Sequence, residues 1–130
     1  MKCLDTDLLV AILRGENDAR PIVTELDASG RSATTSINAF ELFYGANHSQ
    51  RKSENVGKVR TLLRKLEVLP LSLEASETAG EILAGLASYG EGIDYRDAMI
   101  AGIVLESGFS LVTRNKKHFA RIPKLKLETW

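Results

Sequence analysis

The chain has 130 residues, of which 44% are hydrophobic and 26% charged, as expected for one soluble globular domain that can bury its own core. Its formal net charge is +0, so nucleic-acid binding would depend on a local basic patch. The single cysteine, Cys3, excludes an intrachain disulfide and reads as a small buried residue. The longest apolar stretch, residues 98–105, is far shorter than the ~20 residues that span a bilayer, and no apolar signal region precedes it. We therefore expect a cytoplasmic protein without membrane association.

The first half of the chain predicts two strands, each followed by helical segments. In chain order we expect a strand at 2–4, a helix at 6–14, a helix at 18–29, a strand at 32–35 and a helix that contains Glu41. Gly15 and Gly30 follow the first two helices, Pro21 lies near the start of the second, and Ser36 is the expected cap of the third.

The second half continues the alternation of helices and strands. We expect a basic amphipathic helix at 51–66, a strand at 68–71, a helix at 73–89, a loop at 90–92, a helix at 94–107, a strand at 109–112, a turn at 115–119 and an edge strand at 125–127. The 94–107 helix is apolar nearly all round and should be buried. This alternation predicts a single α/β sandwich with a mostly parallel sheet, whose strands present their carboxyl ends to ligands.

Glu41 is the most informative residue of the chain. It is the only Asp, Glu, Lys or Arg between residues 31 and 51, and a helix would place it among Ile37, Phe40 and Tyr44. A buried carboxylate without a partner costs several kcal/mol or more, and this segment contains no cation. A divalent metal shared with other acids is the simplest partner. The alternatives are that Glu41 reaches solvent or bonds to a neighbour: Thr35, Asn38 or Tyr44. Asn38 could also orient it.

Three aspartates adjoin apolar segments in the same way. Asp5 directly follows the first strand; it could cap the next helix, but we expect it to be an inward ligand, with Asp7 on the first helical turn. Asp94 and Asp97 have the spacing of a capping box before the apolar helix. Asp97 should point inward because it shares a helix face with residues 101 and 104. For Asp94, capping and metal binding are equally open.

The remaining polar candidates follow the 109–112 strand. Thr113 and Asn115 could hydrogen-bond the acids and a metal-bound water, or Asn115 could cap the following turn. All candidate ligands are oxygens, which suits Mg²⁺ or Mn²⁺ and disfavours Zn²⁺. Neither His48 nor His118 fits a ligand pattern, and there is no Gly-rich phosphate loop. The residues thus predict a metal-dependent hydrolase of phosphodiesters.

Basic residues could form a rim around this site. Arg114, Lys116 and Lys117 follow the last strand of the predicted site, and further cations lie in the 51–66 helix and the C-terminal segment. Such runs are often only a solvated face. Beside an acidic site, however, they would attract a polyanion that the carboxylates alone would repel.

The order and spacing of five segments resemble the PIN-domain ribonucleases, and more narrowly the VapC-type toxins of prokaryotic toxin–antitoxin pairs. The segments are Cys-Leu-Asp-Thr-Asp-Leu-Leu-Val-Ala-Ile-Leu at 3–13, Asn-Ala-Phe-Glu-Leu-Phe-Tyr-Gly-Ala at 38–46, Ile-Asp-Tyr-Arg-Asp-Ala-Met-Ile-Ala-Gly at 93–102, Leu-Val-Thr-Arg-Asn-Lys-Lys-His-Phe at 111–119 and Leu-Glu-Thr-Trp at 127–130. The resemblance implies a three-layer α/β/α sandwich with about five strands over residues 1–130. It also implies Mg²⁺- or Mn²⁺-dependent endoribonuclease activity, a homodimer, and inhibition by a small antitoxin whose C-terminal segment covers the site.

Carried over to this sequence, the resemblance makes Asp5, Glu41 and Asp97 the metal-binding acids, with Asp94 less certain because many relatives have a non-acidic residue there. Thr113 matches the hydroxyl residue of the family. Asn115 stands where relatives often have an acid, which leaves the number of metals open.

Two other functions fit parts of the sequence. Asp5 and Asp7 have the spacing of the acids that open haloacid-dehalogenase-type phosphatases, although two leucines follow where those enzymes have Gly-Thr. A degenerate nuclease fold retained as an RNA- or protein-binding module is the other alternative. Clustered acids facing a polyanion argue against a pure binder.

Overall fold

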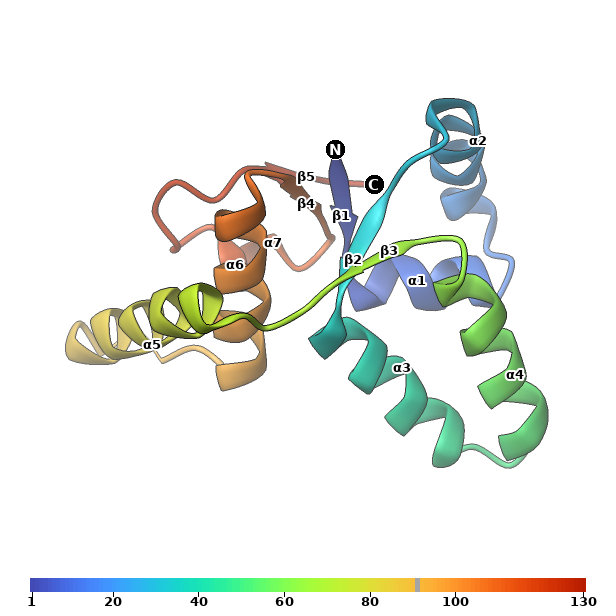
Figure 1. The fold of residues 1–130 in the computed structure, drawn as a ribbon, viewed down its shortest axis with the longest axis horizontal. Helices are drawn as coiled ribbons and strands as arrows, with labels where there is room; N and C mark the ends of the chain where they lie inside the picture. Colours follow the sequence, from blue (N-terminus) through green and yellow to red (C-terminus); the bar gives the residue numbers. More distant parts are fainter. Residues whose placement is uncertain (91) are drawn as a thin grey trace.

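A five-stranded parallel sheet forms the centre of the computed structural model, which describes residues 1–90 and 92–130 (Figure 1). Its strands are β1 (Lys2–Leu4), β2 (Ala33–Thr35), β3 (Glu67–Leu69), β4 (Ser110–Val112) and β5 (Leu127–Glu128), in the order β3-β2-β1-β4-β5. Every neighbouring pair is parallel, so all five strands end at the same edge of the sheet. The predicted parallel sheet is confirmed.

Helices cover both faces of the sheet and complete three layers. In Figure 1, α1 (Thr6–Leu13), α2 (Arg20–Ser29), α3 (Ser36–Asn47) and α4 (Lys52–Leu63) lie on one side, and α5 (Leu73–Ser88), α6 (Tyr95–Ser107) and α7 (Lys116–Phe119) on the other. Alternate residues of the central strands point to opposite layers, since Leu4 and Val112 pack with α1, α3 and α4 whereas Cys3 and Leu111 pack with α6. The predicted α/β/α sandwich is confirmed.

Several predicted boundaries were wrong, for local reasons. The cap of α3 is Thr35 and not Ser36: the Thr35 side chain accepts from the Asn38 N–H, and the Asn38 side chain accepts from the Thr35 N–H. β3 ends at Leu69 because Pro70 has no amide N–H to extend a strand. The expected 18–29 helix begins as a separate 3₁₀ turn, Asn17–Ala19, before Pro21 opens α2.

Towards the C-terminus the differences are shifts of a few residues. The expected turn at 115–119 is the short helix α7, and the last strand begins two residues later than predicted, where Leu127 pairs with Leu111. The helix α4 ends at Leu63, earlier than expected. The predicted loop at 90–92 includes Glu91, which lies outside the described residues. The helix α6 is buried as predicted, and among the described residues no helix is long and apolar enough to cross a membrane.

Candidate functional site

Asp5 lies at the centre of a hydrogen-bond network at the carboxyl edge of the sheet. Its side chain is buried, and Oδ1 accepts from the Thr6 N–H at 2.9 Å and from Asn38 Nδ2 at 2.9 Å. Oδ2 accepts from Thr113 Oγ1 at 2.7 Å. Burial is the main cause that raises the pKa of Asp5 to about 6, and the nearby charge of Asp7 adds to it. Asp5 therefore both caps α1 and points inward.

Glu41 joins this network through a hydroxyl. Thr6 Oγ1 donates to Glu41 Oε1 at 2.8 Å and accepts from Asn38 Nδ2 at 2.9 Å. Asn38 thus orients Asp5 directly and Glu41 only through Thr6, so the alternative of a direct bond between Asn38 and Glu41 is not what the structure has. Burial raises the pKa of Glu41, although its side chain keeps 24% of its surface exposed. Phe40 and Tyr44 are exposed, so they do not enclose the carboxylate as the helical spacing suggested.

Asp97 reaches the same edge from the first turn of α6. Its Oδ2 lies 3.2 Å from His118 Nδ1, which in turn lies 2.9 Å from Asn115 Nδ2. Burial is the largest cause that raises the pKa of Asp97. Asn115 directly precedes α7 at its N-cap position, but its side chain makes no capping bond. His118 fits no ligand pattern in the sequence, yet in the structure it contacts a predicted acid.

Asp94 faces solvent and caps α6. Its carboxylate accepts from the Arg96 N–H at 2.8 Å, and Arg96 Nε and Nη2 each donate to it at 3.2 Å. The side-chain hydrogen bond from Arg96 is the main cause that lowers the pKa of Asp94. These contacts support the capping role, and a metal role for Asp94 stays a prediction.

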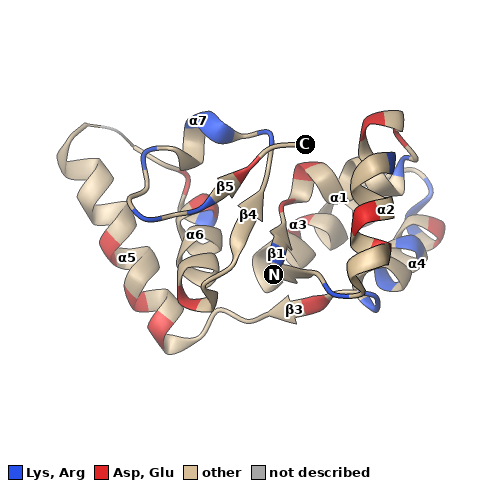
Figure 2. Cartoon of the chain, turned by 90° about the horizontal axis from the view of Figure 1, so that it is seen from above, with Lys and Arg blue, Asp and Glu red and all other residues tan. Residues whose placement is uncertain are grey.

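The predicted basic residues differ in whether other side chains already contact them. Arg114 is held in place: its Nη2 donates to Asp18 at 3.1 Å, and its guanidinium carbon lies 3.7 Å above the Trp130 ring. Lys116 and Lys117 are exposed on α7, where Figure 2 shows basic residues gathered near the C-terminus. Of the predicted cations, these two lysines are the better placed for an external anion.

The three predicted acids come from different elements but end at one edge of the sheet. Asp5 follows β1, Glu41 lies on α3 and Asp97 on α6, and the charge of Asp97 contributes to the raised pKa of Glu41. Their oxygen donors are of the kind that Mg²⁺ prefers. Among the described residues, however, no three His, Cys, Asp or Glu side chains lie close enough to share a metal ion. The chemistry of the donors thus fits a metal ion, but the side chains as they lie do not surround a common binding position.

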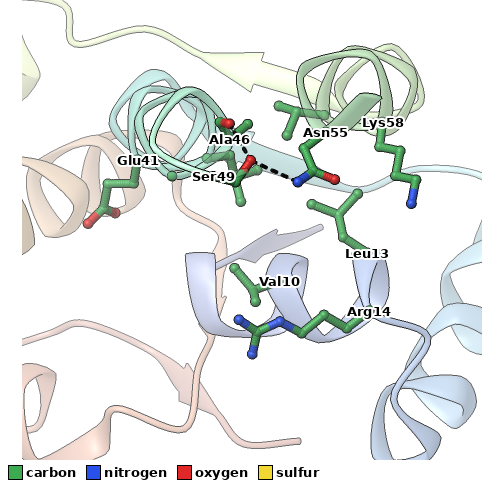
Figure 3. Close-up of a pocket in the computed structure, with 11 residues that line it drawn as sticks. Val10, Leu13, Arg14, Glu41, Ala46, Ser49, Asn55 and Lys58 are labelled. Atoms are coloured by element: carbon green, nitrogen blue, oxygen red, sulfur yellow. Dashed lines mark hydrogen bonds between the residues drawn. The ribbon is translucent and has the colours of Figure 1, made fainter. Parts of the chain in front are cut away.

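A groove opens beside Glu41, between α1, α3 and α4 (Figure 3). Its volume is about 520 Å³, and its lining is largely apolar, with residues such as Val10, Leu13 and Val59. Arg14 and Lys58 add positive charge. The acidic site is therefore continuous with an apolar groove that carries two cations.

The PIN domain family model matches residues 2–125, which is nearly the whole chain. The chain belongs to the PIN domain family. It is 33% identical to the tRNA(fMet)-specific endonuclease VapC of Salmonella typhimurium and 34% identical to the ribonuclease VapC2 of Rickettsia felis, in both cases over 98% of this chain and 96% of the relative. The expected resemblance to VapC-type PIN proteins is confirmed.

Solved structures of such PIN proteins have the same fold. The chain aligns with the Rickettsia felis VapBC2 structure, bound to a promoter DNA fragment, with a TM-score of 0.90 and 31% identity over 99% of this chain and 98% of that one. DNA-bound VapBC from Salmonella typhimurium gives a TM-score of 0.91 and 32% identity over 99% and 97% of the chains.

Proposed function

We propose that this PIN domain protein is an endoribonuclease that hydrolyses RNA phosphodiester bonds and is the toxin of a toxin–antitoxin pair. The observation that carries the proposal is the meeting of Asp5, Glu41 and Asp97 at one edge of the sheet. Relatives that are about one third identical over the whole chain are named VapC ribonucleases. Three acids with raised pKa values at one edge supply oxygen donors for a cation, which a nuclease can use on a phosphodiester.

We further propose Mg²⁺ or Mn²⁺ as the cofactor, held by Asp5, Glu41 and Asp97. When bound, such an ion supplies an activated water and stabilises negative charge on the phosphate. The protein itself fixes the ligands: Asn38 and Thr113 hold Asp5, and Thr6 holds Glu41. These donors are neutral, so they orient the carboxylates without cancelling the charge that attracts a cation.

One observation favours the alternative of a binding module without catalysis. Among the described residues the acids are not close enough to form a ready metal cage. If they cannot converge, the domain would bind RNA or protein without cutting.

The contacts of Asp7 weaken the phosphatase alternative. Asp7 accepts from the Arg114 N–H and from Trp130 Nε1, and it thereby ties the C-terminus to α1.

Surfaces next to the site are our proposed contacts for RNA, for an antitoxin and for a second copy of the chain. Lys116 and Lys117 would contact the RNA backbone, and Arg114, which Asp18 and Trp130 hold in place, lies just before them in the chain. The apolar groove beside Glu41 is our proposed contact for an antitoxin, since the similar VapBC structures are complexes. Exposed aromatic residues on α3 and at the start of α6, such as Tyr44 and Tyr95, support a homodimer.

The decisive experiment compares wild type with Asp97→Asn and with Asp27→Asn, an exposed aspartate of α2 that serves as control. End-labelled tRNA(fMet) and an unstructured RNA are incubated with Mg²⁺, Mn²⁺ or EDTA. We expect metal-dependent cleavage by wild type and Asp27→Asn, and none by Asp97→Asn. Full cleavage by Asp97→Asn, or in EDTA, would overturn the site assignment. RNA binding without cleavage under all conditions would favour the binding module.

A further inference from the structure

Arg96 is a charged side chain at the site, and the proposed chemistry assigns it no role. It lies on the first turn of α6, one residue before Asp97. Its Nη1 lies 3.8 Å from Glu41 Oε2, while Nε and Nη2 face Asp94. Among the lysines and arginines of the described residues, Arg96 alone pairs with one of the three predicted metal-binding acids.

The guanidinium is held in a fixed orientation. Asp94 accepts from Nε with one oxygen and from Nη2 with the other, which is the paired geometry that fits a planar guanidinium. The third nitrogen, Nη1, is thereby directed towards Glu41. The side chain remains 42% exposed, so an external anion can reach it. Asp94 thus positions Arg96.

A polyanionic substrate needs such a cation at this place. Asp5, Asp7, Glu41 and Asp97 all carry carboxylates near the same edge, and a phosphate that approaches them is repelled. Arg114 is already engaged with Asp18 and Trp130, and the lysines of α7 lie on a different element. Arg96 is the guanidinium in direct ionic contact with the site.

We infer that Arg96 is a substrate-binding residue, which contacts a phosphate of single-stranded RNA next to the bond that is cut and is oriented for this by Asp94. The inference rests on the proposed nuclease function. In the protein without ligands, Arg96 partly balances Glu41. Once a cation engages Glu41, the ionic contact with Nη1 weakens, and the nitrogen is free to bind a phosphate oxygen. Guanidinium groups suit this contact because they bind oxyanions with directed N–H groups.

The test measures the salt dependence of RNA binding. Anisotropy of a short fluorescent single-stranded RNA is followed in Ca²⁺, which binds oxygen ligands, and a gel checks that the RNA stays intact. Each phosphate contact contributes about 0.7 to the slope of log affinity against log salt for single strands. Between about 50 and 200 mM salt, Arg96→Gln should therefore lower the slope by about 0.7 and weaken binding.

Two variants separate a phosphate contact from a general effect of charge or structure. Arg31→Gln removes the same charge from an exposed residue before β2, at the opposite edge of the sheet, and should leave the slope unchanged. Arg96→Lys keeps the charge and should restore the slope, with weaker binding because the fork to Asp94 is lost. Ca²⁺ should bind Arg96→Gln at least as tightly as wild type, because a nearby positive charge has been removed.

The outcomes separate this inference from the proposed function. A wild-type slope in Arg96→Gln, in a protein that binds and cleaves RNA, would overturn the phosphate contact and leave Arg96 as a counter-ion of Glu41 only. A slope that falls equally in Arg31→Gln would also overturn it. Wild-type protein that neither binds nor cleaves RNA would instead overturn the proposed function, and this inference with it.

Discussion

Replacing Asp5 by Asn should stabilise the metal-free protein at neutral pH. Asp5 is 6% exposed, and burial raises its pKa from the ordinary 3.8 to about 6. The folded state therefore binds the proton of Asp5 more tightly than the unfolded state does. The stabilisation by this proton is complete below pH 3.8 and is lost as the pH rises through about 6.

The size of the effect follows from the two pKa values. The difference between 3.8 and about 6 corresponds to about 3 kcal/mol of unfolding free energy, and about half of it is lost between pH 5 and 7. An asparagine avoids this cost and can keep the network. Its oxygen would accept from the Thr6 N–H and from Asn38, and its amide could donate to the Thr113 hydroxyl. That hydroxyl could then donate to Asp7 instead, which lies 3.3 Å away. One rearranged hydrogen bond costs about 1 kcal/mol.

We therefore expect Asp5→Asn to raise the unfolding free energy at pH 7 by about 2 kcal/mol, and by less at pH 5. Urea unfolding in EDTA at several pH values between 5 and 7.5 measures this, with Asp27→Asn as the exposed control. Glu41 and Asp97 also have raised pKa values. We expect them to contribute the same pH dependence to the wild type and to both variants, so this contribution cancels in the difference. A variant no more stable than wild type at pH 7, or a difference that does not grow with pH, would refute the reasoning.

Three further variants test the packing and the network. Gly102→Ala should destabilise by about 1–3 kcal/mol in urea unfolding, because the added Cβ would lie 2.5 Å from the Ala75 carbonyl oxygen where α5 and α6 pack. Thr6→Val should weaken Mn²⁺ binding about 10- to 100-fold by calorimetry, because it removes the hydroxyl that holds Glu41; unchanged affinity would contradict this role. Asp94→Asn should destabilise at neutral pH and lose this effect as the pH falls, since the pKa of Asp94 is lowered; pH-resolved thermal melts measure it.

Much of the fold was predictable because local patterns and the sheet agree. The apolar run at 98–105 predicted a buried helix, and residues 100–104 are indeed enclosed. The strands were placed to within about two residues, but they are only two or three residues long, so backbone pairing and not side-chain pattern sets their ends. β5 illustrates this: its position is set by pairing with β4, which no local sequence signal specifies.

The candidate acids were predictable one by one, but their partners were not. Glu41 was selected because it is isolated in an uncharged segment, and Asp97 because it begins an apolar helix. Thr6 lies 35 residues from Glu41, and Arg96 reaches Glu41 from a different helix. Such contacts depend on how the helices cross the sheet edge. His118 was missed for the same reason, since only the folded chain brings α7 to the first turn of α6.

The choice of partners around Asp5 bears on what the site is for. A chain selected only for stability could place an arginine or lysine against this buried carboxylate and lower its pKa. Instead the donors are a threonine hydroxyl, an asparagine amide and a backbone N–H, all neutral. They fix the direction of the carboxylate and leave its charge uncompensated, at a cost of about 3 kcal/mol at neutral pH. Arg96, the guanidinium that pairs with Glu41, stands at the exposed side of the site. This distribution leaves the inner acids free for an added cation and the outer arginine for an anion, as hydrolysis of a phosphodiester requires.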